Sequence, residues 1–545
     1  MKRRTLLKAG IASVSSIYLS KIYGRNFRVA KNIPPVPIHF QPTWQSLAQY
    51  QVPEWFRDAK FGMWAHWGPQ CQPERGDWYA REMYMEGSDK YKFHCEKYGH
   101  PSRFGFKDVI NEWKAEKWDP EAIMALYKKT GARYFMALAN HHDNFDLFNS
   151  KYHKWNSTNL GPKKDLIAGW AKAAKNNGLP FGVSVHSAHA WSWYETAQRS
   201  DKTGPLANIP YDGKLTAADG AGKWWDGYDP QELYAQDHPL SENSLDNMAI
   251  HRQWNWGNGV YPPSKAYCEN FYNRVINLID NYEPDLIYFD DTALPLWPVS
   301  DAGLRIAAYQ YNKSIKKYGE LKAIIYGKIL DEQQRKCMVW DIERGHSNNI
   351  EPLPWQTDTC IGAWHYDRRI YDNNSYKTAT TVIHMLADIV SKNGNLLLNI
   401  PLRGNGSADE KEMAVIEGIG NWMQVNGEAI YGTRPWKLYG EGPSTENIAP
   451  INAQGFNEGK GKPYTSKDIR FTSKGKILYA ILLGWPEDKT LIIQSLATGS
   501  VLVNNVTILG HKDSLSFEQS AEGLKVNIPD MPPRKDACTL KIETR

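Results

Sequence analysis

Residues 134–143 read YFMALANHHD, and this stretch indicates the fold more clearly than any other. Six apolar residues, Tyr134 to Ala139, stand together, and the polar residues Asn140 to Asp143 follow at once. A continuous apolar run of this length is typical of a strand that is buried on both faces, as in a parallel sheet covered by helices. The stretch therefore predicts a parallel α/β sheet with polar groups at its carboxyl edge.

The same pattern recurs along the chain, separated by longer amphipathic stretches. Seven further runs are interpreted as strands: Phe61–His66, Phe181–His186, Leu286–Asp290, Ala323–Gly327, Met338–Glu343, Cys360–Trp364 and Leu396–Ile400. Eight strands with interposed helices predict an α/β fold, a (β/α)8-type TIM barrel. A doubly wound open sheet is the alternative, but no GxGxxG motif follows a strand to favour it.

Two stretches depart from this alternation. Residues 191–263 are rich in Gly, Asp, Asn and Trp and are too long for a plain strand-to-helix loop, so we interpret them as an insertion over the barrel mouth. Past Gly432 the helical periodicity stops, and short β-rich runs follow at residues 477–483, 491–493 and 502–509. We therefore expect a barrel domain at residues 25–432 and a C-terminal β-sandwich at residues 433–545.

The first 24 residues are expected to be an export signal. Lys2, Arg3 and Arg4 precede a short, weakly apolar stretch, and KRRTLLK resembles the twin-arginine type of bacterial signal. An ordinary Sec signal or a disordered basic start is the alternative. No other segment reaches 18 consecutive apolar residues, so no transmembrane segment is expected. The protein is thus expected in the periplasm or at the cell surface of a bacterium.

Composition narrows the function. The net charge is only +5 over 545 residues and no run of five basic residues occurs, so a nucleic-acid partner is not expected. The chain has 22 Trp and 30 Tyr, whose flat faces can stack on sugar rings. Six scattered cysteines without a CxxC pair indicate neither a disulfide scaffold nor a structural zinc site. Composition therefore favours a carbohydrate ligand.

Carboxylates and imidazoles follow several of the predicted strands. In a barrel, residues at the carboxyl ends of the strands surround one cavity, and paired carboxylates are what glycoside hydrolysis requires. The residues at these positions are His66, His141, His142, His186, Asp290, Asp341 and Glu343. The sequence therefore predicts a glycosidase site at this end of the barrel.

Two other interpretations remain open at this point. Asp290 or Asp341 could instead cap the helix that follows its strand. His66, His141, His142, His186 and Asp290 could instead bind a metal that activates water. Against the metal, neighbouring histidines on a strand point to opposite faces, and an HExxH pair is absent.

These residues resemble the motifs of a known family, the α-L-fucosidases of glycoside hydrolase family 29. The similar segments are WFRDAKFGMWAHWGP at 55–69, NHHDNFDLFNSKY at 140–152, PDLIYFDD at 284–291 and DIVSKNGNLLLNIPLRGNG at 388–406. The resemblance implies a retaining, exo-acting α-L-fucosidase that needs no cofactor and acts on fucosylated glycans. It places Asp290 as the nucleophile, Tyr288 at the position of a family tryptophan, and His66, His141 and His142 on the sugar.

The acid/base residue is placed by local context. VWDIERGH at 339–346 makes Glu343 the choice, with Asp341 and Glu332 as possible substitutes. Trp78 and Trp364 are expected to position and stack the sugar ring.

Three departures from the family pattern concern specificity. Asp77 stands before Trp78 where many members have Glu, and Lys328 stands roughly where an arginine is common. GVSVHS at 182–187 is expected to leave His186 and His189 near the pocket. An altered rim could admit a C6 hydroxyl, so an α-L-galactosidase acting on L-galactose-containing algal or other polysaccharides is the alternative. A catalytically silent carbohydrate-binding protein on the same scaffold is a further one.

Overall fold

The computed structural model describes residues 39–235, 238–247, 256–257, 259–446 and 456–545. The expected export signal at residues 1–24 lies outside these ranges. Within them, no helix combines the length and apolarity needed to cross a membrane. The six cysteines, all in the described part of the chain, are unpaired.

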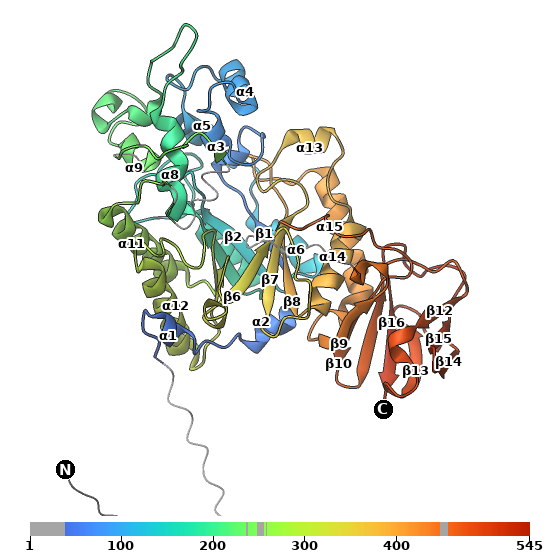
Figure 1. Ribbon diagram of the computed structural model, residues 1–545. Helices are drawn as coiled ribbons and strands as arrows, with labels where there is room; N and C mark the ends of the chain where they lie inside the picture. The colour runs from blue at the N-terminus through green and yellow to red at the C-terminus, as the bar shows by residue number, and fades with distance from the viewer. Residues whose placement is uncertain (1–38, 236–237, 248–255, 258, 447–455) are drawn as a thin grey trace, which may run out of the picture. The chain divides into compact units, whose positions relative to one another are not determined.

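Eight parallel strands close into a barrel in sequence order, as the sequence predicts (Figure 1). The strands are β1 Phe61–Ala65, β2 Tyr134–Asn140, β3 Phe181–Val185, β4 Leu286–Phe289, β5 Ile324–Gly327, β6 Val339–Glu343, β7 Trp355–Cys360 and β8 Gly394–Asn399. The strand residues are buried throughout, with Trp340 alone half-buried, because helices cover the outer face and side chains fill the inside.

The position predicted for the seventh strand was wrong. The apolar run 360–364 overlaps β7 only at Cys360, and the strand itself is WQTDTC. Its polar side chains are tolerated inside the barrel because they find partners there: Gln356 donates to Asp341 and accepts from Tyr134, and Asp358 accepts from the Tyr288 hydroxyl. A strand of this kind carries no apolar run to detect.

Helices precede β1 and follow every barrel strand except β5 and β6. They are α1 Trp44–Leu47, α2 Glu54–Ala59, α3 Tyr79–Glu82, α4 Asp89–Lys97, α5 Phe106–Glu112, α6 Pro120–Thr130, α7 Leu166–Asn176, α8 Ala190–Trp193, α9 Pro230–Tyr234, α11 Lys265–Tyr282, α12 Ala302–Tyr318, α13 Arg368–Asp372, α14 Ala379–Ser391 and α15 Glu410–Asn426. In α6 the Asp119 side chain accepts from Ala122 N–H, Pro120 opens the first turn, and Gly131 ends the helix at a φ of 113°.

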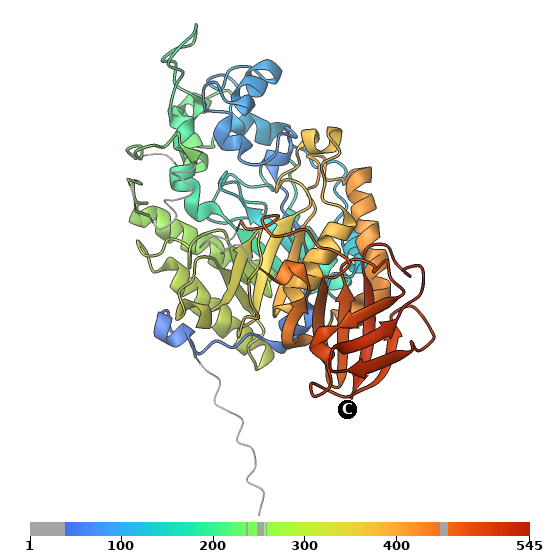
Figure 2. The same ribbon diagram turned by 45° about the vertical axis from the view of Figure 1, so that its right-hand side comes forward.

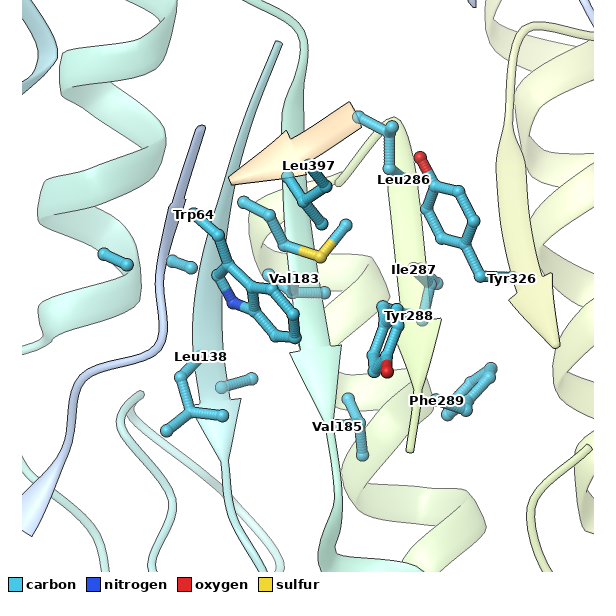
Figure 3. Packing of buried hydrophobic residues seen from close by; sticks show 14 of the residues in the cluster. Trp64, Leu138, Val183, Val185, Leu286, Ile287, Tyr288, Phe289, Tyr326 and Leu397 are labelled. Carbon is cyan, nitrogen blue, oxygen red and sulfur yellow. The ribbon is translucent and has the colours of Figure 1, made fainter. Parts of the chain in front are cut away.

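Large aromatic side chains fill the inside of the barrel (Figure 3). Trp64 and Tyr288 meet with ring centroids 5.0 Å apart, and Tyr326 lies 6.1 Å from Tyr288. Gly62 on β1 leaves the room that the Tyr134 ring takes, since a Cβ there would come within 2.3 Å of the ring. This filling raises the floor of any cavity to the carboxyl ends of the strands.

The described residues between β3 and α11 form short helices. This part of the chain packs against α3, because the buried Arg81 guanidinium of α3 donates to the carbonyl oxygens of Trp193 and Ser244. The Trp193 ring lies 6.1 Å from that of His141, beyond the end of β2. The residues interpreted as an insertion therefore contribute to the wall at the carboxyl end of the barrel.

The C-terminal residues form two antiparallel sheets, which confirms the predicted β-sandwich class (Figure 2). One has the strand order β13-β16-β11-β10-β9 and the other β12-β15-β14. The strands are β9 Arg434–Glu441, β10 Ile469–Lys474, β11 Ile477–Leu482, β12 Thr490–Ile493, β13 Val503–Ile508, β14 Phe517–Ser520, β15 Gly523–Asn527 and β16 Cys538–Thr544. A buried ion cluster joins this domain to the barrel: Asp388 of α14 accepts from Lys392 at 2.7 Å and from Arg470 of β10 at 2.6 Å.

Candidate active site

One pocket at the carboxyl ends of the barrel strands gathers the polar residues singled out in the sequence. Its lining consists of Trp64, His66, Asp77, Trp78, His141, His186, Tyr288, Asp290, Lys328, Glu343, Asp358 and Trp364. Every expected site residue is in this lining except His142, which lies directly behind it and contacts Asp290. The structure thus brings together side chains from seven strand ends and the loop before α3.

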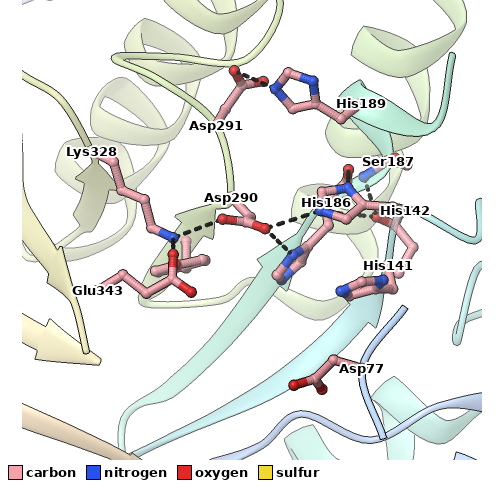
Figure 4. A network of polar contacts seen from close by, with 12 residues as sticks. Asp77, His141, His142, His186, Ser187, His189, Asp290, Asp291, Lys328 and Glu343 are labelled. Carbon is pink, nitrogen blue, oxygen red and sulfur yellow. Dashed lines mark hydrogen bonds and ion pairs between the residues drawn. The ribbon is translucent and has the colours of Figure 1, made fainter. Parts of the chain in front are cut away.

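Asp290 follows β4 and is held by three donors (Figure 4). Its Oδ2 lies 3.1 Å from both His142 Nε2 and His186 Nδ1, and its Oδ1 accepts from Lys328 Nζ at 2.7 Å. Burial alone would raise the pKa of this carboxyl, but the Lys328 ammonium and the two histidines outweigh it and hold the pKa well below its usual range. Asp290 is therefore an ionised, oriented carboxylate, as a nucleophile must be.

Lys328 joins Asp290 to Glu343. Its Nζ donates to Glu343 Oε2 at 2.5 Å as well as to Asp290 Oδ1, so these two oxygen atoms lie no more than about 5.2 Å apart. Burial would lower the pKa of the ammonium, yet the two carboxylates raise it well above its usual value. Lys328 is therefore a cation fixed between two carboxylates.

Glu343 ends β6 and differs from Asp290 in its electrostatics. Burial raises its pKa, Lys328 opposes that rise, and the negative charge of Asp290 adds to it. The net pKa lies above the usual value, whereas that of Asp290 lies far below. Two carboxyl groups whose pKa values are pushed apart in one pocket are suited to the roles of proton donor and nucleophile.

The two substitutes for Glu343 lie elsewhere. Glu332 is exposed in the loop between β5 and β6, outside the pocket lining. Asp341 is buried behind the lining, accepts from Gln356 Nε2 at 2.9 Å, and has its pKa raised by burial to about 6. Neither faces the space beside Asp290, so Glu343 is the carboxyl that the geometry favours.

The adjacent histidines of the second strand do not point to opposite faces, contrary to the prediction. The regular strand ends at Asn140, and the rings of His141 and His142 lie on the same side, 4.5 Å between centroids. His141 Nδ1 accepts from the Gln70 amide at 2.8 Å, and burial lowers its pKa well below the usual value. The ring is therefore neutral and presents an Nε2–H to its surroundings.

Two groups of three histidines have ring nitrogens close enough together to hold a metal ion. One consists of His66, His141 and His365, and the other of His141, His142 and His186. In each, His141 keeps its proton on Nε2 because Nδ1 is occupied by Gln70. In the second group, His142 and His186 are engaged with Asp290. An N–H donor set of this kind fits sugar hydroxyl oxygens better than a cation, which needs unprotonated nitrogens.

The His66 ring has two buried nitrogens that a bound ligand could contact. Both of its ring nitrogens are buried without a hydrogen-bond partner among the described residues, and burial lowers its pKa well below the usual value. Buried polar atoms are normally paired, so an unpaired neutral imidazole on a pocket wall is suited to one donor and one acceptor contact with a hydroxyl.

His365 lies beside His66 and His141 and is not among the site residues predicted from the sequence. Its ring lies 4.8 Å from that of His66 and 4.7 Å from that of His141, and it is fully buried. The predicted seventh strand ends at Trp364, so the sequence pattern does not place His365 at a strand end. His189, by contrast, lies outside the pocket lining: its Nε2 meets Asp291 Oδ1 at 3.1 Å.

Asp77 fixes the loop that carries Trp364 and His365. Its two oxygens accept from the backbone N–H groups of His365 at 2.7 Å and of Trp364 at 3.2 Å. Burial would raise its pKa, but the His365 contacts outweigh this and lower it. The Asp77 carboxylate therefore lines the pocket and also holds in place the loop that carries Trp364, another lining residue.

Comparisons with known proteins identify the family of this chain. The model of the family described as alpha-L-fucosidase matches residues 29–428, and that of the alpha-L-fucosidase C-terminal domain matches residues 462–543. Tissue alpha-L-fucosidase of Rattus norvegicus is 25% identical over 93% of this chain and 93% of its own length. The Homo sapiens tissue enzyme is 25% identical over 91% and 89%.

Solved structures share the fold. Thermotoga maritima alpha-fucosidase in complex with fucose has a TM-score of 0.67 at 24% identity, covering 92% of this chain and 100% of that one. A GH29 alpha-L-fucosidase of Bacteroides thetaiotaomicron, trapped as a covalent intermediate, has a TM-score of 0.58 at 16% identity, covering 91% and 97%. The family match spans most of the barrel and the pocket residues described above. The chain therefore belongs to the α-L-fucosidase family, glycoside hydrolase family 29.

Proposed function

We propose that this glycoside hydrolase removes terminal α-L-fucosyl residues with retention of configuration, using Asp290 as nucleophile and Glu343 as acid/base. One observation carries the proposal: Lys328 holds an oxygen of each carboxylate within about 5.2 Å of the other. Retaining glycosidases place their two carboxyl groups roughly 5–5.5 Å apart, whereas inverting enzymes need roughly 6.5–9.5 Å to admit a water.

The reaction has two steps. Asp290 attacks the anomeric carbon to form a glycosyl ester while Glu343 gives its proton to the departing glycosidic oxygen. Glu343 then takes a proton from water, which attacks the anomeric carbon; the bond from that carbon to the Asp290 oxygen breaks and frees the carboxylate. His66, His141, His142 and His186 hold the hydroxyls or the nucleophile, and no cofactor takes part.

The charge on Asp290 controls the role of Glu343. In the free enzyme, burial and the Asp290 charge hold the pKa of Glu343 above its usual value, which favours the protonated acid. Ester formation removes the Asp290 charge while the Lys328 ammonium stays, and the pKa of Glu343 falls. The same carboxyl can then act as the base of the second step.

The stereochemical outcome tests the proposal. Proton NMR of the first minutes of hydrolysis of an aryl α-L-fucoside is expected to show the α-anomer of free fucose before it equilibrates. Initial formation of the β-anomer would exclude double displacement. Sugar binding without any turnover would instead select a catalytically silent binding protein.

The pH dependence provides a second test. Activity needs Asp290 ionised and Glu343 protonated, so kcat/KM should fall only well below the usual aspartate pKa of 3.8 and again above the raised pKa of Glu343. The Glu343→Ala variant is expected to lose the alkaline fall when assayed on a dinitrophenyl fucoside, whose leaving group needs no proton. An unchanged alkaline fall in that variant would exclude Glu343 as the acid.

α-L-galactoside hydrolysis is a second candidate, favoured by the polar wall around Asp77. His365 is buried there, with Nδ1 3.4 Å from Asp77 Oδ1 and with Nε2 lacking a hydrogen-bond partner in the described part of the chain. A C6 hydroxyl would supply such a partner, which the C6 methyl of fucose does not.

The test of this candidate compares aryl α-L-fucoside with aryl α-L-galactoside on wild type and on His365→Phe. If His365 binds a C6 hydroxyl, the variant should lose about 10-fold or more in kcat/KM on the galactoside, the effect of leaving a polar group unpaired, and little on the fucoside. A wild-type preference for the fucoside with equal losses on both substrates would exclude the galactosidase reading.

A further inference from the structure

A short segment of the C-terminal part of the chain, residues 456–458, contacts the backbone that carries Glu343. Phe456 N–H donates to the carbonyl oxygen of Glu343 at 2.8 Å, and Glu458 N–H donates to that of Arg344 at 3.0 Å. These contacts join the acid/base residue to a segment more than a hundred positions later in the sequence.

The Asn457 side chain makes two hydrogen bonds to the backbone of His346. Its Oδ1 accepts from His346 N–H at 2.8 Å, and its Nδ2 donates to the His346 carbonyl at 3.0 Å. The side chain is buried, and it lies so close to Gly345 that a Cβ there would come within 2.5 Å of Oδ1. The second residue after β6 is thus a glycine that leaves room for this amide.

Glu458 holds the neighbouring strand in the same way. Its carboxylate accepts from Thr359 Oγ1 of β7 at 2.8 Å and pairs with Lys377 at 2.6 Å and with Arg344 at 3.8 Å. The carboxyl ends of β6 and β7 are therefore tied to one three-residue segment.

The end of β6 needs such support. Its pairing with β5 stops at Gly327 with Trp340, three residues before Glu343, so β5 offers no ladder bond to the Glu343 carbonyl. Directly beyond, Arg344 has a φ of 44°, a conformation that a side-chain-bearing residue adopts only when its surroundings impose it.

We propose that residues 456–458 position the carboxyl of Glu343 for proton transfer to the glycosidic oxygen. The inference rests on the proposed role of Glu343 as acid/base. Asn457 and Glu458 are positioning residues: they act through the backbone of residues 343–346 and do not touch the sugar. The C-terminal domain then contributes to catalysis although none of its described residues lines the pocket.

A misplaced acid affects substrates unequally, and this gives the test. Proton donation matters for a phenyl α-L-fucoside, whose leaving group is basic, and hardly for a dinitrophenyl α-L-fucoside. Asn457→Ala and Glu458→Gln are expected to lower kcat/KM on the phenyl substrate about 10-fold more than on the dinitrophenyl substrate, as a displacement well under an ångström would. The ratio of the two values does not depend on how much of a preparation is folded.

Two reference variants complete the experiment. Thr380→Ala removes another hydrogen bond between the barrel and the C-terminal domain, to Asp536, and should leave the ratio at the wild-type value. Glu343→Ala should show a larger change of ratio than either positioning variant. If Glu343→Ala leaves the ratio unchanged, the proposed function is wrong; if only Glu343→Ala changes it, the positioning role is wrong.

Discussion

Replacing Asp290 with alanine is expected to lower kcat by roughly 10⁴-fold or more, the largest effect of any single substitution in this protein. The carboxylate is the group that the structure keeps ionised beside the pocket, with three donors on its two oxygens. Without it, no covalent intermediate forms, and hydrolysis proceeds only through the remaining electrostatic stabilisation.

Azide provides a sharp check of this role. A small anion can enter the space left by the Asp290 side chain and attack the anomeric carbon from the same face, so Asp290→Ala with azide should yield β-L-fucosyl azide. Glu343→Ala, in which the ester still forms, should yield the α-azide. An unfolded variant would give neither product, and the same azide anomer from both variants would contradict the assigned roles.

Replacing Lys328 with methionine should lower kcat/KM by roughly 10²-fold and move the whole pH profile to higher pH. The ammonium lowers the pKa of both Asp290 and Glu343, against burial, which raises both. When the cation is removed, both pKa values rise. The acidic fall then begins at a higher pH because Asp290 protonates more easily, and the alkaline fall is delayed because Glu343 holds its proton longer.

Lys328→Arg serves as the matched control, because it keeps the charge and changes only the geometry. It should retain the wild-type pH limits while losing part of the rate, since a planar guanidinium cannot reproduce the 2.7 and 2.5 Å contacts from one nitrogen atom. The measurement is the kcat/KM–pH curve of the wild type, of Lys328→Met and of Lys328→Arg. A Lys328→Met profile with unshifted limits would show that Lys328 does not tune the pKa values of the two carboxyl groups.

The sequence by itself determined the barrel and singled out Asp290 as the proposed nucleophile. Strands such as Tyr134–Asn140 are buried on both faces and are mostly apolar, and this apolar run can be recognised in the sequence without knowledge of its partners. Asp290 stands at the end of such a strand, and strand ends in a barrel converge on one cavity. Local pattern and topology therefore point to the same residue.

Tertiary structure alone decided the features that depend on partners distant in sequence. The polar strand WQTDTC is stable inside the barrel only because Tyr134, Tyr288 and Asp341 satisfy its side chains, and no local pattern records this. Its misplacement also concealed His365. Lys328 could be placed in the pocket from the sequence, but not between two carboxylates from different strands. Asn457 reaches the backbone after Glu343 through a contact that spans more than a hundred residues, because hydrogen-bond geometry, unlike hydrophobicity, is specified only when both partners are in place.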